Sequence, residues 1–403
     1  MTTPISPVPP PLARTPEEWV EALKGLGGRA FHARQVFRWL QGRSVLDARQ
    51  MTDLPASLRD RLAPLEMERT LEIAQERRSS DHTRKLLVRM RDGATVETVL
   101  IPGVTGPKGR LPSPLASDEE PAFSAMEEGD DDDLDEETPP AEAKGAAAAI
   151  RVTQCISTQV GCAQGCVFCA SGVAGLKRNL GADEIVAQVL AGRARLDDGE
   201  RLTNVVYMGM GEPLANYDAT ARSLRILTHP DGIALSSRRV TISTSGLVPE
   251  IARLGQDFAG KVGLAISLHA ADDDTRSRLM PINKKYPLAV LMDALRAYPL
   301  PPRRRITIEY TLVSGKNDTV LEARKLVKIL RGLPVKVNLI PMNPIDASTL
   351  GPPQMSGVLA FQRVLCDAGY SCFIRRRRGD DVAAACGQLA LLGAKPKVRV
   401  NRA

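Results

Sequence analysis

Three cysteines stand close together in one short stretch of the chain, and their spacing suits a metal cofactor. Cys162, Cys166 and Cys169 follow the pattern C-x3-C-x2-C within GCAQGCVFCASG. Three thiolates on one loop can hold a single iron–sulfur cluster, and the small residues between them let the backbone approach the sulfurs. Three ligands on a four-iron cluster leave one iron open, which suits substrate chemistry better than electron transfer.

A structural zinc site is the simplest alternative for these thiols. Zinc normally takes four protein ligands, often from C-x2-C pairs. The nearest further thiol is Cys155, and none of the four histidines lies beside the loop: His32, His82, His229 and His269. The ligand count therefore favours a three-cysteine cluster over zinc and over unligated buried cysteines.

The cysteine pattern resembles the signature of radical S-adenosylmethionine (SAM) enzymes, with the aromatic Phe168 before the last cysteine. The resemblance implies a [4Fe-4S] cluster held by Cys162, Cys166 and Cys169, whose open iron binds the amino and carboxylate groups of SAM. One electron then cleaves SAM to a 5′-deoxyadenosyl radical. It also implies an α/β fold, a partial (β/α)6 TIM-like barrel.

The chain after residue 150 alternates between short β-branched runs and segments with helical spacing. The β-branched runs cover residues 151–158, 203–208, 239–244, 262–268, 305–313 and 335–340. Six strand-then-helix units predict a parallel sheet covered by helices. The pattern does not decide between an open doubly wound sheet and an incomplete barrel.

Polar motifs follow the predicted strands, at the end where a parallel barrel gathers its chemistry. MGMGEP follows the second run, STSG ends the third, SLH ends the fourth, and an asparagine follows the sixth. Each motif alone is more often a turn or a cap, but their shared position argues against coincidence. By the resemblance, the SAM-binding residues are Gly211, Glu212, Ser243, Ser267, Leu268, His269 and Asn343.

Two further cysteines lie outside the loop. Cys155 precedes Cys162 by seven residues, and Cys386 lies in GDDVAAACGQL, where composition alone favours a small buried residue in an alanine-rich helix. Together with VETVLIPG, GCVFCASG, MGMGEP, STSG and SLHA, these segments resemble the motif series of the RlmN family. The resemblance covers roughly residues 15–102 and 151–395.

Members of that family are radical-SAM methyltransferases that act on carbon 2 of adenine 2503 in 23S rRNA, and in many bacteria also on adenine 37 of tRNA. The resemblance implies that Cys386 takes a methyl group from one SAM and that a second SAM generates a radical on it. Cys155 then completes the release through a transient disulfide. Glu97 is implied as a proton acceptor, although its residue type alone favours an ordinary exposed strand glutamate.

The chain divides into segments of different composition. Residues 1–14 are Pro-rich and predicted to be disordered, and residues 15–83 are predicted to form a helical accessory domain that binds RNA. The other predicted segments are a β-hairpin extension (84–102), an acidic flexible insertion (103–150), the radical-SAM core (151–395) and a basic tail (396–403).

Charge is unevenly distributed along the chain. The formal net charge is +7, but residues 118–142 hold 13 acidic and no basic side chains, which leaves 54 lysines and arginines facing 34 acids elsewhere. A body this basic predicts an anionic macromolecular partner, above all nucleic acid. Arg303–Arg305 and Arg375–Arg378 are the densest clusters, and each fits a solvated face as well as a phosphate contact.

The sequence predicts a cytoplasmic protein without a membrane partner. No run of about 18 apolar residues is present, and the Pro-rich start lacks the apolar core of a secretory signal. The expected partners are 23S rRNA, tRNA and an electron donor such as flavodoxin or ferredoxin, acting on a monomer. Cys366 and Cys372 match no motif and are expected to be core thiols.

Two alternatives to carbon-2 methylation stay open. A Cfr-type enzyme methylates carbon 8 of the same adenine with the same pair of cysteines, so the motifs do not separate the two cleanly. A non-enzymatic iron–sulfur protein that binds RNA is the second alternative. The open coordination site and the pairing of Cys155 with Cys386 argue against it.

Overall fold

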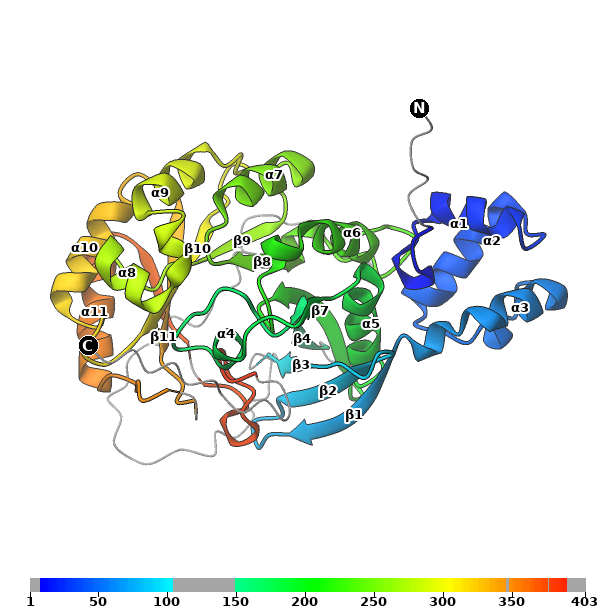
Figure 1. Ribbon diagram of the computed structural model, residues 1–403, viewed down its shortest axis with the longest axis horizontal. Helices are drawn as coiled ribbons and strands as arrows, with labels where there is room; N and C mark the ends of the chain where they lie inside the picture. The colour runs from blue at the N-terminus through cyan, green and yellow to red at the C-terminus, as the bar shows by residue number, and fades with distance from the viewer. Residues whose placement is uncertain (1–7, 104–148, 346–347, 376, 390–403) are drawn as a thin grey trace.

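The computed structural model describes residues 8–103, 149–345, 348–375 and 377–389 (Figure 1). The predictions for residues 1–7, for the acidic insertion over residues 104–148 and for the basic tail over residues 396–403 concern parts of the chain outside the described residues.

One ten-stranded sheet organises the described residues, in the order β1-β2-β3-β4-β7-β8-β9-β10-β11-β12. The first four strands pair antiparallel, and the strands from β4 onward pair in parallel. The strands are β1 (Leu71–Arg78), β2 (Arg84–Met90), β3 (Thr95–Pro102), β4 (Ile150–Cys155), β7 (Glu200–Tyr207), β8 (Val240–Thr244), β9 (Gly263–Ser267), β10 (Ile306–Leu312), β11 (Val335–Pro341) and β12 (Ser371–Ile374). A separate two-stranded ladder joins β5 (Gln159–Val160) to β6 (Arg178–Asn179).

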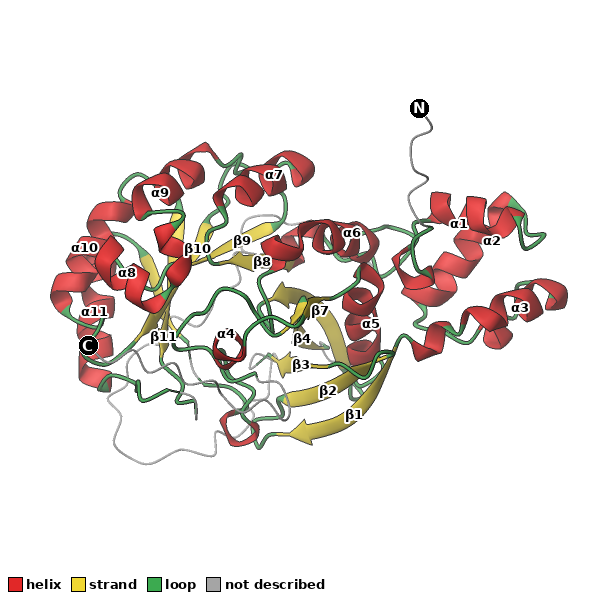
Figure 2. Cartoon of the chain, viewed as in Figure 1, coloured by secondary structure: helices red, strands yellow, loops and turns green. Residues whose placement is uncertain are grey.

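Helices connect successive parallel strands and lie along the outside of the sheet (Figure 2). They are α5 (Ala182–Arg193), α6 (Tyr217–Leu227), α7 (Val248–Phe258), α8 (Asp273–Leu279), α9 (Leu288–Ala297), α10 (Val320–Leu330) and α11 (Met355–Asp367), and the short α4 (Ala170–Ala174) lies in the loop after β4. Strands β1 and β12 are the two edges of the sheet, so the barrel is incomplete. The predicted partial (β/α)6 barrel is confirmed. None of the helices in the described part of the chain is both long and apolar enough to cross a membrane.

Two strands of the ten-stranded sheet were not predicted from the sequence, and neither was the separate ladder of β5 and β6. Strand β12 has only four residues and precedes an arginine run, so it lacks a clear strand pattern. Strand β1 is an edge strand whose side chains are mostly exposed, and its sequence LEIAQERR therefore shows little apolar alternation. Because β1 pairs with β2, residues 71–78 belong to the sheet, and the predicted extension of the helical domain to residue 83 is wrong.

The N-terminal helices are α1 (Pro16–Lys24), α2 (Ala30–Phe37) and α3 (Ala56–Leu62). Thr15, Pro16 and Glu18 match the sequence pattern of a capping box, and the structure confirms it: Thr15 Oγ1 accepts from the Glu18 backbone N–H at 3.4 Å, and the Glu18 carboxylate accepts from the Thr15 N–H at 2.9 Å. The predicted disorder is wrong for Leu12, which is fully buried in a 3-10 helix over Pro11–Ala13. Its carbonyl accepts from Gln41 Nε2 at 3.1 Å, so an apolar side chain and a hydrogen bond anchor this Pro-rich segment.

Phe37 on α2 joins the N-terminal helices to the barrel. Its ring meets His229 edge-on at 4.8 Å between ring centroids and is fully buried. We expect Phe37→Ala to lower the free energy of unfolding by about 3–5 kcal/mol, because it removes a buried aromatic side chain and leaves a cavity. Denaturant unfolding measures this loss. Phe31→Ala, at an exposed position of the same helix, is the control, and an equal loss in both variants would contradict the assigned contact.

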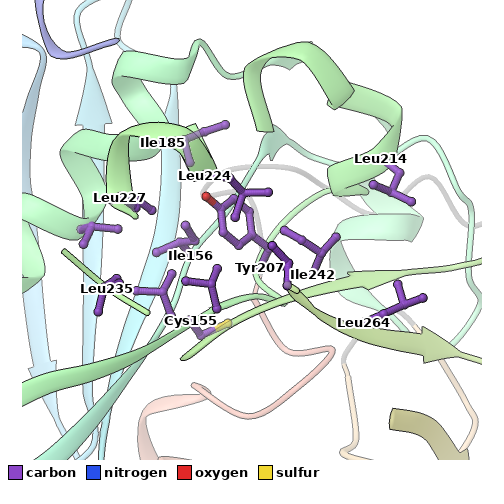
Figure 3. Packing of buried hydrophobic residues seen from close by; sticks show 14 of the residues in the cluster. Cys155, Ile156, Ile185, Tyr207, Leu214, Leu224, Leu227, Leu235, Ile242 and Leu264 are labelled. Carbon is purple, nitrogen blue, oxygen red and sulfur yellow. The ribbon is translucent and has the colours of Figure 1, made fainter. Parts of the chain in front are cut away.

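The hydrophobic core reaches the carboxyl end of the first parallel strand. Figure 3 shows Cys155 at the end of β4 among apolar side chains that include Ile156 and Tyr207. Cys155 is 8% exposed and is the last residue of β4. It therefore lies at the boundary between the hydrophobic core and the polar motifs that follow the strands.

Candidate active site

The loop that carries the three cysteines is closed by the β5–β6 ladder. Gly161 has φ +79°, and a Cβ added there would lie 1.9 Å from the Gly175 carbonyl oxygen, so only glycine fits. The Cys162 N–H donates to the same carbonyl at 3.2 Å, and Cys169 lies directly before α4. Gly161 and Gly175 therefore bring the two ends of the loop together.

The three thiols lie near one another; Cys162 is buried, and Cys166 and Cys169 are half-buried. Burial raises the pKa of Cys162 to about 12, with a smaller contribution from the nearby Cys169. Burial and the neighbouring thiols also raise the pKa of Cys166, and burial raises that of Cys169. Each free thiol therefore holds its proton, and metal binding would have to displace these protons.

The donor set fits a four-iron cluster. The described residues contain no group of three His, Cys, Asp or Glu side chains placed to hold a single metal ion. A cluster does not require such convergence, because each thiolate binds its own iron atom. A Cβ on Gly172 would lie 2.9 Å from the Cys166 nitrogen, so this close approach leaves room only for glycine.

Glu212 is buried between two of the predicted motifs. Its Oε1 accepts from the Leu214 N–H at 3.0 Å, and its Oε2 accepts from the Ser245 N–H at 2.7 Å. Burial raises the pKa of Glu212, and these hydrogen bonds oppose that rise. The carboxylate also raises the pKa of Cys162 and Cys166, so it lies close to the loop thiols. An acceptor in this position suits an ammonium group bound beside the cluster.

Gly211 holds this carboxylate in place. Its φ is +101°, and an added Cβ would lie 2.5 Å from the Gln159 Cβ. The Gln159 side chain accepts from the Glu212 N–H at 2.8 Å. The glycine thus allows the turn after β7 to pack directly on the strand β5 that precedes the cysteines.

A buried arginine that the sequence reasoning missed joins the STSG and SLH motifs. Arg276 on α8 donates to the Ser245 carbonyl at 2.7 Å and to the Leu268 carbonyl at 3.0 Å. Ser243 and Ser267, at the ends of β8 and β9, are half-buried beside these turns. Arg276 is fully buried, but a DDTRSRL segment reads as an ordinary solvated helix, so the sequence carries no signal for this role.

His269 is buried as a neutral imidazole. Burial, reinforced by the charge of Arg276, lowers its pKa to about 3. Its Nδ1 accepts from the Thr311 N–H at 2.8 Å, which leaves the proton on Nε2. The ring packs edge-on against Phe168 of the cysteine loop at 4.8 Å between centroids. The protonated Nε2 of His269 is therefore a potential hydrogen-bond donor beside the loop.

Lowering the pH should destabilise the protein through His269. The unfolded histidine titrates near 6.5 and the folded one near 3, so the unfolded state takes up the proton first. Its stabilising contribution is complete above pH 6.5 and is lost as the pH falls, by about 2 kcal/mol at pH 5. We expect His269→Gln to show a smaller loss of unfolding free energy between pH 7 and pH 5. Identical pH dependence in both proteins would contradict the buried neutral state.

Asn343 links the barrel to the C-terminal segment that carries Cys386. Its Nδ2 donates to the Cys386 carbonyl at 3.0 Å, whereas its buried Oδ1 has no hydrogen-bond partner among the described residues. The next residue, Gly387, accepts from the Ala170 N–H at 2.8 Å, so this segment packs on α4 beside the cysteine loop. In Figure 1 the red C-terminal segment lies next to α4. The free Oδ1 is an acceptor available to a bound ligand.

Cys386 and Cys155 lie close together although 231 positions separate them in the sequence. Burial raises the pKa of Cys155 to about 12, and the charge of Cys386 adds to that rise, while Arg375 opposes it. Cys386 likewise raises the pKa of Cys169. Cys386 is exposed, and both thiols are free. An accessible thiol thus lies near both a buried thiol and the cysteine loop.

Glu97 lies on the same face of the sheet as Cys155. Strand β3 pairs with β4 so that Val99 is opposite Cys155, and Glu97 lies two residues from Val99. The carboxylate is 8% exposed, and its Oε1 is 3.0 Å from Lys85 Nζ. The reading of Glu97 as an exposed strand residue is therefore wrong, and the strand register puts Glu97 on the face of the sheet that carries Cys155.

The structure also tests the expectations for the two cysteines outside the motifs and for the arginine cluster after β12. Cys372 is buried as expected, but Cys366 is exposed, so its assignment to the core is wrong. Part of the arginine cluster after β12 is engaged within the protein: Arg375 lies 3.9 Å from Glu309, and Arg378 lies 3.7 Å from Asp81. These ion pairs tie the C-terminal segment to the rest of the protein, so the charge of these arginines serves the fold as well as any bound partner.

Comparisons with known proteins agree with this arrangement. The model of the radical SAM superfamily matches residues 156–327, and the model of the ribosomal RNA large subunit methyltransferase N-terminal domain matches residues 15–66. The crystal structure of a radical SAM methyltransferase from Sphaerobacter thermophilus superposes with a TM-score of 0.78 at 41% identity, covering 94% of this chain and 98% of that one.

Relatives along the whole length carry one name, dual-specificity RNA methyltransferase RlmN. The protein from Sorangium cellulosum is 65% identical over 99% of this chain and 98% of its own length. The protein from Syntrophobacter fumaroxidans is 43% identical, covering 93% of this chain and 94% of its own. With the cysteine loop, the strand-end motifs and the paired thiols already in place, the chain belongs to the RlmN family of the radical SAM superfamily.

Proposed function

We propose that this protein is a radical-SAM RNA methyltransferase that methylates carbon 2 of adenine 2503 in 23S rRNA and adenine 37 in tRNA. The observation that carries this proposal is the placement of Cys386 and Cys155 together beside the cysteine loop. A SAM enzyme that transferred a methyl group directly would need neither thiol. Each turnover uses two SAM molecules, one as methyl donor and one as radical source.

The chain offers a fitted site for both cofactors. Cys162, Cys166 and Cys169 would hold the [4Fe-4S] cluster, which supplies the electron that converts bound SAM to a radical. Glu212 would accept from the SAM ammonium. Donors and acceptors for its carboxylate and ribose would come from Gly211, Ser243, Ser267, Leu268, His269 and Asn343.

Three further side chains, those of Cys386, Cys155 and Glu97, would carry out methyl transfer and the proton transfers that accompany it. Cys386 is exposed and can take the methyl group as a thiolate nucleophile. After the carbon has joined the adenine, the sulfur of Cys155 bonds to that of Cys386 as the carbon–sulfur bond breaks, and the carbon takes a proton to become a methyl group. Glu97 accepts the proton that leaves carbon 2 of the adenine, and the one electron that the adduct must lose for the ring to become aromatic again would return to the cluster held by the three loop cysteines. The resulting disulfide must be reduced before the next turnover.

The chain outside residues 118–142 carries a net positive charge, which would attract RNA to this site. The helical unit that matches the family's N-terminal domain carries exposed arginines, among them Arg43, which stacks on Trp39 at 4.1 Å from the ring centroid. Cations of this kind grip phosphates, while the target adenine must be extruded to reach a buried site. We also infer a monomer that takes electrons from a flavodoxin or ferredoxin and works in the cytoplasm, where these RNAs are found.

Product identification tests the proposal against its alternatives. Reconstituted protein is incubated anaerobically with SAM, a reductant and an rRNA or tRNA fragment, and the RNA is then digested to nucleosides. We expect 2-methyladenosine. Finding 8-methyladenosine would support the Cfr-type alternative, and finding no methylated adenosine with either RNA would leave only a binding protein.

A further inference from the structure

The turn between β1 and β2 contacts the segment that carries Cys386 through a reciprocal pair of hydrogen bonds. Asp81 Oδ2 accepts from the Gly379 N–H at 3.0 Å, and Asp381 Oδ2 accepts from the Ser80 N–H at 3.1 Å. Each segment thus uses a carboxylate to bind the backbone of the other. The contact joins residues about 300 positions apart.

Lys85 extends this contact into the site. Its Nζ donates to the Ala383 carbonyl at 3.0 Å and lies 3.0 Å from Glu97 Oε1. Its side chain is 10% exposed. Lysine is almost never buried unless it is paired, and a single ammonium can donate in three directions. One buried cation therefore touches both the strand that bears Glu97 and the segment that bears Cys386.

The segment before Cys386 needs such a contact to keep its shape. Gly379 and Ala383 both adopt left-handed backbone conformations, at φ +64° and +52°. Alanine rarely takes this conformation, and it persists only where surrounding contacts hold it. The Ala383 carbonyl that accepts from Lys85 belongs to the residue with this unfavourable backbone, three positions before the thiol.

The strand register places Lys85 in line with Cys155. Lys85 pairs with Val99 across β2 and β3, and Val99 pairs with Cys155 across β3 and β4. Residues opposite one another in paired strands point to the same face. Lys85, Glu97 and Cys155 therefore share one face of the sheet, and Lys85 is hydrogen-bonded to the backbone of the Cys386 segment.

We propose that Lys85 is a positioning residue whose ammonium holds the Glu97 carboxylate and the Ala383 carbonyl together and so sets the place of Cys386 relative to Glu97 and Cys155. This role rests on the proposed function, because it assigns Lys85 to the methyl-transfer site. It makes the β-hairpin a support for the C-terminal segment as well as the carrier of Glu97. Lys85 acts through these two contacts, with the Glu97 carboxylate and the Ala383 carbonyl.

Lys85→Met tests the role, because methionine keeps the length of the side chain and loses its charge and donors. We expect faster amide hydrogen exchange in residues 379–385. We also expect kcat for RNA methylation to fall about 100-fold, the cost typical of a small misplacement of reacting groups, with KM for RNA unchanged. Arg89→Met is the matched control, since Arg89 lies on the same strand and pairs with the exposed Glu72. Lys85→Arg should recover part of kcat.

A double variant separates positioning from simple charge balance. Lys85→Met alone removes the ammonium that lies against the buried Glu97 carboxylate, whereas Lys85→Met with Glu97→Gln removes both charges of this pair and should fold. If Lys85 only neutralised Glu97, exchange in residues 379–385 would return to the wild-type rate in the double variant. The proposal expects it to stay fast, because the bond to Ala383 is still missing.

Wild-type exchange rates in both variants would overturn the proposal, and so would a loss confined to KM. The exchange measurement needs no catalysis. Failure of the wild-type protein to methylate RNA would therefore reject the proposed function while the contact between Lys85 and the segment is still tested on its own.

Discussion

Replacing Cys386 with alanine should give a protein that binds its cluster normally and forms no methylated RNA. The Cys386 thiol is the accessible member of the pair and would carry the methyl group, whereas the cluster ligands lie on a different loop. The loss should be complete, because the adenine carbon cannot attack SAM directly. Cluster absorbance and methylated nucleoside are measured on the same sample.

Cys366→Ala is the matched control for this variant. Cys366 is also an exposed free thiol, but it lies on α11, and among the described residues no contact ties it to the site. Its replacement should leave both cluster and product at wild-type levels. Product formation by Cys386→Ala would remove the methyl carrier from the mechanism.

Replacing Cys155 with alanine should trap the RNA on the protein. Without the buried thiol, no sulfur is placed to bond to Cys386 as the carbon–sulfur bond breaks, so the methylene bridge between Cys386 and the adenine persists. We expect a protein–RNA adduct at up to one RNA per chain and almost no free product. Denaturing electrophoresis of labelled RNA detects the adduct.

The buried Cys372 provides the control for that experiment. It is 7% exposed, much like Cys155, but it lies on β12 and pairs in register with Val337. Cys372→Ala should release product normally and form no adduct. An adduct in both variants, or in neither, would contradict the assignment of Cys155 to product release.

Much of the fold could be predicted because its signals are local. The β-branched runs mark six parallel strands, and Thr15, Pro16 and Glu18 mark the start of the first helix. Strands β1 and β12 escaped prediction because an exposed edge strand and a four-residue strand carry little pattern. Leu12 escaped because prolines around it suggested disorder, although a single leucine can anchor such a segment in the core.

The site was predictable where motifs end strands, and much less so where distant segments meet. The thiol pair and Glu97 came from a family resemblance, because nothing near Cys386 in the sequence indicates Cys155 or β3. Arg276 and Lys85 carry no sequence signal at all: each is a charged residue in an ordinary helix or strand whose burial becomes evident only in the structure. Residues that support a site by donating to backbone carbonyls are hard to predict. Every residue has such a carbonyl, so the sequence does not show which one will accept.

The most direct test of the account follows the hydrogens of the methyl group. Cys386 is first methylated with SAM that carries a trideuterated methyl group, and the protein then completes a single turnover with unlabelled SAM and RNA. If the methyl group passes through a radical on Cys386, it loses one deuterium and regains one hydrogen, and mass spectrometry should find two deuterium atoms in the 2-methyladenosine. A product with three deuterium atoms would show direct transfer, and one with none would show that Cys386 does not carry the methyl group.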